Sequence, residues 1–149
     1  MREPTTEEIR DLLDRAHRIA VVGLSTDESR PSYEVAEYLQ SVGYQILPVN
    51  PKHAGKEILG EPVVSRVTEL EGPIDIVQLF RRAIDTLRPV DEAIAAGAGA
   101  IWMQLGIRND EVGQKAADAG LFVVMDRCME IEHRRLIGVH RGRIGASEP

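Results

Sequence analysis

The residues best suited to chemistry form one segment near the N-terminus. An apolar run, residues 20–23, ends in glycine and is followed by a hydroxyl-rich loop. Hydroxyl groups, backbone N–H groups and an arginine fork donate hydrogen bonds to phosphate oxygens, and proline at position 31 fits the first turn of a helix, where anions bind. The segment predicts a site for a nucleotide-type ligand, formed by Gly23, Ser25, Thr26, Arg30 and Ser32.

A second segment, Asn50-Pro51-Lys52, narrows the choice of ligand. A dinucleotide fold that binds NAD usually carries Asp or Glu at the tip of its second strand, where the carboxylate holds a ribose hydroxyl. An uncharged residue followed by a cation suits a ribose that bears an extra phosphate, as in coenzyme A or NADP. The alternative is a simple turn, since Asn and Pro are common turn formers. We predict that Asn50, Pro51 and Lys52 bind the ligand, with Lys52 facing a phosphate.

Two later apolar runs end in side chains that suit the same ligand. Phe80 could stack on an adenine ring, and Arg81 or Arg82 could reach a phosphate; the alternative is a core aromatic followed by a charged helix start. The run 102–106 could line the pocket for the rest of the ligand, although buried sheet residues have the same composition.

No catalytic or metal-binding set is expected. Cys128 has Glu130, Glu132 and His133 nearby, but a lone cysteine is more often a small buried apolar residue than a nucleophile. The four histidines lack the spacing of metal ligands.

Composition limits the class of partner. The net charge of −6 argues against non-specific nucleic-acid binding, which needs a basic face. No apolar run approaches the roughly 20 residues of a membrane span, and the polar N-terminus lacks the apolar core of a secretory signal. We expect a cytoplasmic protein whose ligand is a small molecule, with no nucleic-acid or membrane partner.

The elements that must position these residues alternate along the chain. Strands are predicted at 18–23, 44–49, 74–80, 100–105 and 121–125. Helices are predicted from Thr5 or Thr6 through Ala16, and at 31–42, 83–96, 109–119 and 126–135, with Pro89 disturbing or dividing the third. Residues 52–62 are expected to form a loop, residues 67–70 a helical turn, and residues 138–149 a basic tail. The alternation predicts an α/β fold with a doubly wound parallel sheet of five strands in the order 3-2-1-4-5, as a single domain over residues 1–149.

These motifs resemble those of a known family, the small stand-alone coenzyme A-binding proteins, related in fold to the N-terminal domain of the succinyl-CoA synthetase α-subunit. The resemblance rests on the segments 21–25, 30–32, 48–51, 102–106 and 126–132. It implies a Rossmann-like domain that holds coenzyme A, with Gly23 and Ser25 on the pyrophosphate and Lys52 near the adenosine end. It also implies that Leu79 and Phe80 border the adenine and that Met103 and Gln104 lie toward the pantetheine.

The resemblance further implies that ligase activity is absent, because the synthetase subunit carries its phosphorylated histidine in a second domain that this chain lacks. We therefore expect binding of coenzyme A or a short acyl-CoA without acyl transfer. Two alternatives stay open: a small NADP-dependent oxidoreductase, and a regulatory or interaction subunit completed by a separate catalytic chain.

Overall fold

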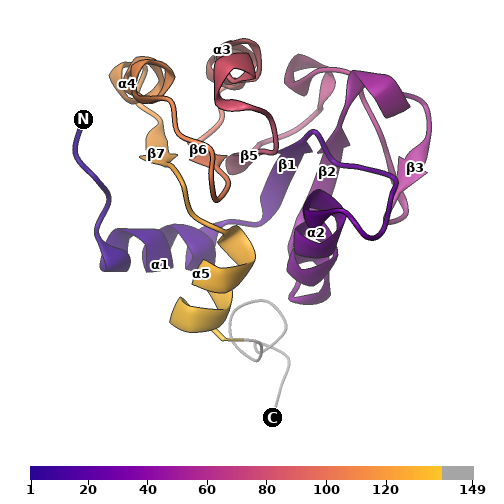
Figure 1. Ribbon diagram of the computed structural model, residues 1–149, viewed down its shortest axis with the longest axis horizontal. Coiled ribbons are helices and arrows are strands. Elements are labelled where there is room, and N and C mark those ends of the chain that lie inside the picture. Colours follow the sequence, from indigo (N-terminus) through magenta and orange to yellow (C-terminus); the bar gives the residue numbers. More distant parts are fainter. Residues whose placement is uncertain (139–149) are drawn as a thin grey trace.

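The computed structural model describes residues 1–138, and the predicted tail beyond Gly138 lies outside them. Five parallel strands form one sheet with helices on both faces (Figure 1). The fold is the α/β, Rossmann-like class that the sequence predicts. The strands are β1 (Arg18–Val22), β2 (Gln45–Val49), β5 (Ile76–Leu79), β6 (Ala100–Met103) and β7 (Phe122–Val124).

The order of the strands differs from the prediction. The sheet runs β2-β1-β5-β6-β7, so β5 pairs with β1 and not with the outer edge of β2. That outer edge is instead contacted by the connecting segment, in which the Val64 N–H donates to the Pro48 carbonyl over 3.1 Å. The chain then crosses to the far side of β1. The direction of winding therefore reverses between β1 and β5, and ligands of such sheets bind beside this switch point.

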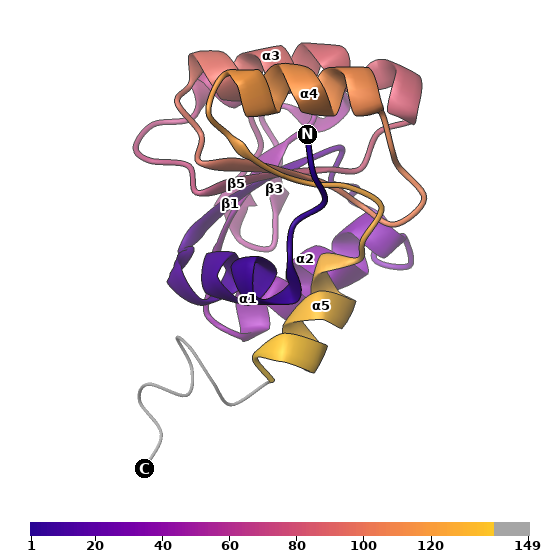
Figure 2. The same cartoon turned by 90° about the vertical axis from the view of Figure 1, so that its left-hand side faces the viewer.

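Two helical layers cover the sheet, as Figure 2 shows. On one face lie α1 (Thr6–Arg15), α2 (Pro31–Ser41) and α5 (Met129–Leu136); on the other lie α3 (Leu87–Ala95) and α4 (Asp110–Asp118). Side chains alternate along each strand, so Ile19 and Val21 join the core under α1, α2 and α5 while Ala20 and Val22 join the core under α3 and α4. Both faces of the strands are buried, which explains their continuous apolar runs.

The helix boundaries follow the predicted signals with two adjustments. The predicted helix 83–96 consists of a 3-10 turn, η3 (Ala83–Asp85), and α3, so the division falls at Thr86, and Pro89 sits in the first turn of α3, where its missing N–H costs nothing. The last helix begins at Met129 and not at 126, because Asp126 has a φ of 59°, which is incompatible with a helix. The 3-10 turn η2 (Val67–Glu69) confirms the predicted helical turn.

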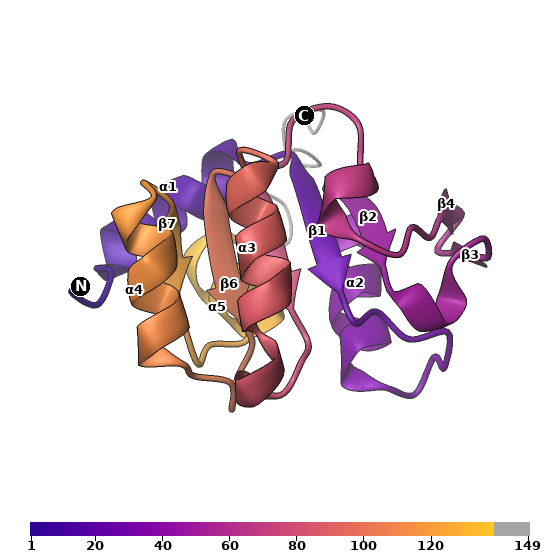
Figure 3. The ribbon, with the colours of Figure 1, turned by 90° about the horizontal axis from the view of Figure 1, so that it is seen from above.

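A 3-10 turn and a small hairpin were not predicted. The 3-10 turn η1 (Pro51–His53) overlaps the start of the predicted loop 52–62. The rest of that loop contains a small hairpin of β3 (Glu57–Ile58) and β4 (Glu61–Pro62), which projects beyond β2 in Figure 3. The hairpin turn places Leu59 and Gly60 at φ values of 55° and 78°. Leucine rarely adopts such a backbone, so of the two turn residues only Gly60 indicates a hairpin turn in the sequence. Within residues 1–138, no helix has the length and apolar character that a membrane span requires.

Candidate functional site

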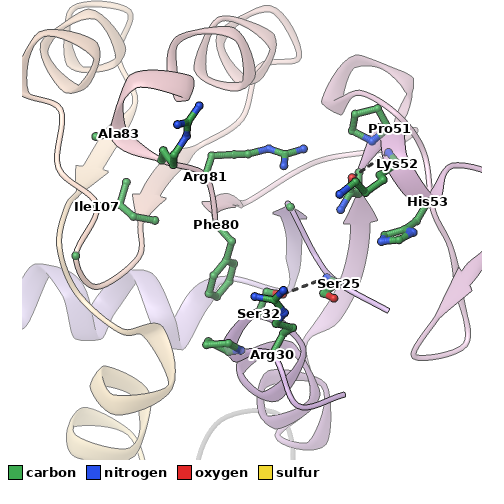
Figure 4. Close-up of a pocket in the computed structure, with 15 residues that line it drawn as sticks. Ser25, Arg30, Ser32, Pro51, Lys52, His53, Phe80, Arg81, Ala83 and Ile107 are labelled. Atoms are coloured by element: carbon green, nitrogen blue, oxygen red, sulfur yellow. Dashed lines mark hydrogen bonds between the residues drawn. The ribbon is translucent and has the colours of Figure 1, made fainter. Parts of the chain in front are cut away.

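An open cavity of about 820 Å³ lies at the carboxyl ends of β1, β2 and β5, and we call it the first cavity (Figure 4). Four segments form its walls: the β1–α2 loop, the turn after β2, the segment after β5 and the loop after β6. Most of the predicted site residues meet here although they are far apart in the sequence. Those lining the cavity are Gly23, Ser25, Arg30, Ser32, Asn50, Pro51, Lys52 and Phe80.

Gly23 is required for the shape of the cavity floor. Its φ is 88°, and a Cβ at this position would lie 2.4 Å from the Phe80 carbonyl oxygen. Its N–H donates to the Val49 carbonyl over 2.8 Å, and the Phe80 N–H donates to the Val22 carbonyl over 2.9 Å. The glycine therefore allows the ends of β1 and β5 to approach closely. Because its N–H is already used, Gly23 offers a ligand its bare Cα and not a hydrogen-bond donor.

The conformation of the β1–α2 loop is fixed by hydrogen bonds to serine hydroxyl groups. The Ser25 N–H donates to the Ser32 hydroxyl over 3.1 Å, and the Asp27 N–H donates to the Ser25 hydroxyl over 2.9 Å. The first turn of α2 has no side-chain cap, and the Ser32 N–H has no hydrogen-bond partner among residues 1–138. An uncapped helix start with a free N–H facing a cavity is suited to an anion.

Asn50 fastens the turn after β2 to this loop. Its side chain is 6% exposed; the amide Nδ2 donates to the Leu24 carbonyl, and Oδ1 accepts a hydrogen bond from the Lys52 N–H, both over 3.0 Å. These two hydrogen bonds require an uncharged amide at position 50. This structural reason adds to the predicted one, that an uncharged residue suits a ribose bearing an extra phosphate. Lys52 is exposed on the cavity wall and, within the described chain, has no ion pair.

Arginines supply further positive charge at the rim. Arg30 lies 3.8 Å from Asp27, whose pKa is lowered chiefly by hydrogen bonds from the Ser29 hydroxyl and N–H, so this acid stays ionised. Arg82 is paired with Asp85 at 2.9 Å. Arg81 has no such partner in the described part of the chain, and in Figure 4 its side chain extends from the end of β5 toward the turn that holds Lys52. Among residues 1–138, Arg81 and Lys52 are therefore the Lys and Arg side chains of this cavity that make no ion pair.

Four predicted site residues do not line the first cavity. Thr26 is exposed outside it. Leu79 and Met103 are fully buried in the core under α3 and α4. Gln104 is 7% exposed, and its Oε1 accepts hydrogen bonds from the Gln78 amide over 3.1 Å and the Met129 N–H over 3.3 Å. Alternation along a strand sends every second side chain to the opposite face, which the resemblance alone did not resolve.

The structure also adds residues that were not assigned to the site. His53 lines the wall beside Lys52, and its ring Nδ1 is buried without a partner in the described chain. Gly106 and Ile107 approach from the loop after β6. Only their positions just after strand ends hint at this role. Cys128 lies elsewhere, at the start of α5, where it lines a separate cavity of about 320 Å³. The described residues contain no cluster of three or more His, Cys, Asp or Glu side chains able to hold a metal ion.

Other proteins are similar to this chain in both sequence and fold. The protein YneT of Bacillus subtilis (strain 168) is 41% identical over 133 residues, which span 89% of this chain and 97% of YneT. A solved structure described as cell-free ID.343 from Thermus thermophilus is 40% identical, with a TM-score of 0.87, and the match covers 90% of this chain and 100% of that chain.

A more distant structure shares the fold alone. The dinucleotide-forming acetyl-coenzyme A synthetase 1 from Ca. Korarchaeum cryptofilum is 21% identical with a TM-score of 0.66, over 77% of this chain and 26% of that chain. The family comparison is more specific, because residues 17–134 match the model of the CoA binding domain. The match spans the whole sheet and every segment that lines the first cavity, and this chain belongs to the family of CoA binding domains.

Proposed function

We propose that this protein binds coenzyme A or a short acyl-CoA in the first cavity and has no ligase activity of its own. The observation that carries the proposal is the match of residues 17–134 to the CoA binding domain, which includes every loop of a cation-rimmed cavity at the switch point of the sheet. The cavity volume of about 820 Å³ is in the range of sites for small molecules and cofactors.

The pyrophosphate of the coenzyme suits the β1–α2 side of the cavity. There the Ser32 N–H has no partner among residues 1–138, and the N-terminal end of α2 contributes a favourable charge interaction of about 0.3–1 kcal/mol. Lys52 and Arg81 can approach the same anion from the opposite wall. The partly buried Phe80 gives the ligand an apolar surface between these groups.

The absence of acyl transfer is part of the proposal. The two serines of the cavity are engaged as hydrogen-bond acceptors for backbone N–H groups, Ser32 for Ser25 and Ser25 for Asp27. In the described chain neither hydroxyl is hydrogen-bonded to a histidine, the partner that activates a serine nucleophile. Incubation with acetyl-CoA should release no free thiol above the rate of buffer alone.

Thermal unfolding with different nucleotides tests the ligand class. A ligand that binds only the folded protein stabilises it by about 2.7 kcal/mol at a concentration of 100 Kd, so coenzyme A should raise Tm by several degrees. NADP and NAD at the same concentration should leave Tm unchanged. A shift with NADP and none with coenzyme A would instead support the oxidoreductase alternative.

A negative charge introduced at the start of α2 tests whether the ligand binds there. Ser32→Asp keeps an acceptor for the Ser25 N–H but places a negative charge where the pyrophosphate is proposed to bind. It should abolish most of the shift with coenzyme A. The matched control is Thr6→Asp, which adds the same charge to the first turn of α1, away from the cavity, and should retain the full shift.

The subunit alternative calls for a different readout. If the protein reports coenzyme A to a catalytic chain, affinity capture from its own cell extract should retain a ligase-type subunit only when coenzyme A is present. Capture that does not depend on coenzyme A would contradict that alternative.

A further inference from the structure

An apolar surface patch lies outside the first cavity, where α5 begins beside the loop after β6. Leu105 from this loop and Ile131 from α5 are 60% and 53% exposed, and both line the cavity of about 320 Å³ that also holds the half-buried Cys128. We call Leu105, Cys128 and Ile131 the α5 patch. Single exposed aliphatic residues are common on protein surfaces, whereas a cluster around a hollow is typical of an interaction site.

Charged residues of both signs border the α5 patch. Within residues 1–138, Asp126 makes no ion pair, and its Oδ1 accepts the Gly106 N–H over 2.7 Å. The next residue, Arg127, lies 3.8 Å from a Glu132 oxygen that Arg135 already holds at 2.6 Å. The patch therefore carries an acid without a cation and, directly beside it, a cation that shares its acid with a closer competitor.

A second copy of the same chain supplies both missing partners. In a two-fold symmetric pair the same surface of each copy meets itself, so a residue on one copy faces a different residue on the other. Asp126 of each copy can then meet Arg127 of the other, while the apolar side chains meet at the centre. We propose that this protein forms a symmetric dimer through the α5 patch, with Leu105 and Ile131 buried between the copies.

An interface at the α5 patch has the composition of known interfaces. Their centres are apolar and poor in charge, and their rims are polar. Here Leu105 and Ile131 form the centre, and Asp126 and Arg127 belong to the rim of the same cavity. A foreign partner with one sign of charge would satisfy only one of these two rim residues, which favours a self-complementary partner.

The dimer also restrains one wall of the first cavity. Leu105 and Arg108 line the cavity of the α5 patch, whereas Gly106 and Ile107, between them in the same loop, line the first cavity. Asp126 holds this loop at two points, because it accepts the Gly106 N–H and its own N–H donates to the Ile107 carbonyl over 3.1 Å. The inference of a dimer does not depend on which ligand the first cavity binds.

Sedimentation equilibrium of the full chain without ligand tests the proposal. Between micromolar and millimolar concentration, the mean mass of the wild type should rise from that of one chain toward that of two. Leu105→Ser/Ile131→Ser should weaken association by roughly 100-fold or more, because it removes the apolar centre of the interface. The control, Ile84→Ser/Leu87→Ser, removes two exposed aliphatic side chains outside the α5 patch and should associate as the wild type does.

Charge reversal tests the pairing across the two-fold axis. Arg127→Glu and Asp126→Arg should each sediment as a single chain, because like charges then face each other between the copies. An equimolar mixture of the two variants should recover the dimer, since each variant supplies the charge that the other lacks.

A wild type that keeps the mass of one chain at every concentration would overturn the proposal. A dimer that persists unchanged in Leu105→Ser/Ile131→Ser would do the same, and so would a mixture of folded charge variants that stays monomeric. Circular dichroism establishes that each variant is folded. If Asp126→Arg does not fold, because the Gly106 N–H loses its acceptor, the comparison of the two serine double variants decides the proposal alone.

Discussion

At the scale of single residues, Gly23 and Asn50 decide the shape of the first cavity. Gly23 lets the Phe80 carbonyl approach to 2.4 Å from where a Cβ would stand. Asn50 joins the Leu24 carbonyl to the Lys52 N–H through its amide. Both residues have contacts inside the protein that fix their identity even without a ligand. A motif that suggests ligand binding can therefore also be a motif of close packing.

Gly23→Ala should destabilise the protein by about 3 kcal/mol or more, because the new methyl group collides with the backbone of β5 and the φ of 88° disfavours alanine. Urea unfolding measures the loss. Gly55→Ala is the matched control: Gly55 has the same φ of 88°, but nothing lies within 4 Å of its Cβ position. That variant should lose only about 1 kcal/mol. Equal losses would show that the contact with Phe80 is unimportant.

Asn50→Asp should lower both stability and ligand affinity. The carboxylate keeps the acceptor for the Lys52 N–H but faces the Leu24 carbonyl, where the amide had donated, at a cost of about 1–3 kcal/mol. It also adds a negative charge to the wall of the proposed anion site, so coenzyme A should bind at least roughly 10-fold more weakly. Gln45→Glu, an exposed site at the other end of β2, controls for net charge. An Asn50→Asp variant with unchanged affinity would remove Asn50 from the site.

At the scale of elements, the helices differ in how they begin. Side chains cap α1 and α4, whereas α2, α3 and α5 begin without a side-chain cap, and α2 begins beside the first cavity. Capping satisfies the N–H groups of the first turn, so an uncapped start keeps them available. The same element can thus serve stability in one position and ligand binding in another.

The cap of α1 predicts a pH dependence of stability. Hydrogen bonds from Arg2, the Thr5 N–H and the Arg2 charge lower the pKa of Glu8 to about 2 from the usual 4.5. Because the pKa is lower in the folded state, this stabilisation is complete above about pH 4.5 and is lost as the pH falls toward 2. Glu8→Gln should flatten the decline of the urea midpoint in that window. Glu7→Gln, in the same turn, should leave the decline as it is in the wild type.

At the scale of the whole molecule, one sheet separates two cores that share every strand. Ile101 belongs to the core under α3 and α4, and its neighbour Trp102 belongs to the core under α1, α2 and α5. Trp102 is fully buried, and its indole N–H donates to the Arg127 carbonyl over 2.8 Å. Neither helical layer can separate without exposing the other face of the same strands, so the cores should be lost together.

Unfolding in urea should therefore be a single transition. Trp102 is the only tryptophan, so its fluorescence reports one core, while far-UV circular dichroism reports all the helices. The two midpoints should coincide, as they do for small two-state domains. A tryptophan midpoint that clearly differs from the dichroism midpoint would show that the layers unfold separately.

Particular elements show which parts of the fold can be predicted from the sequence. Continuous apolar runs locate all five strands, Thr5 with Glu8 marks the start of α1, and Asn109 marks the start of α4. These signals are local, because caps and strand burial depend on residues near one another in the chain. The strand order was predicted incorrectly, since no local signal says on which side of β1 the strand at 76–79 pairs.

The sequence by itself determined the alternation of strands and helices, the phosphate-suited loop after β1 and the absence of an acid at the tip of β2. Only the tertiary structure decided that β5 lies beside β1, which brings Phe80 and Arg81 to Gly23 and sends Leu79 and Met103 into the core. The physical reason is that pairing between distant strands is chosen by the packing of whole faces, whereas propensities and caps act within a few residues.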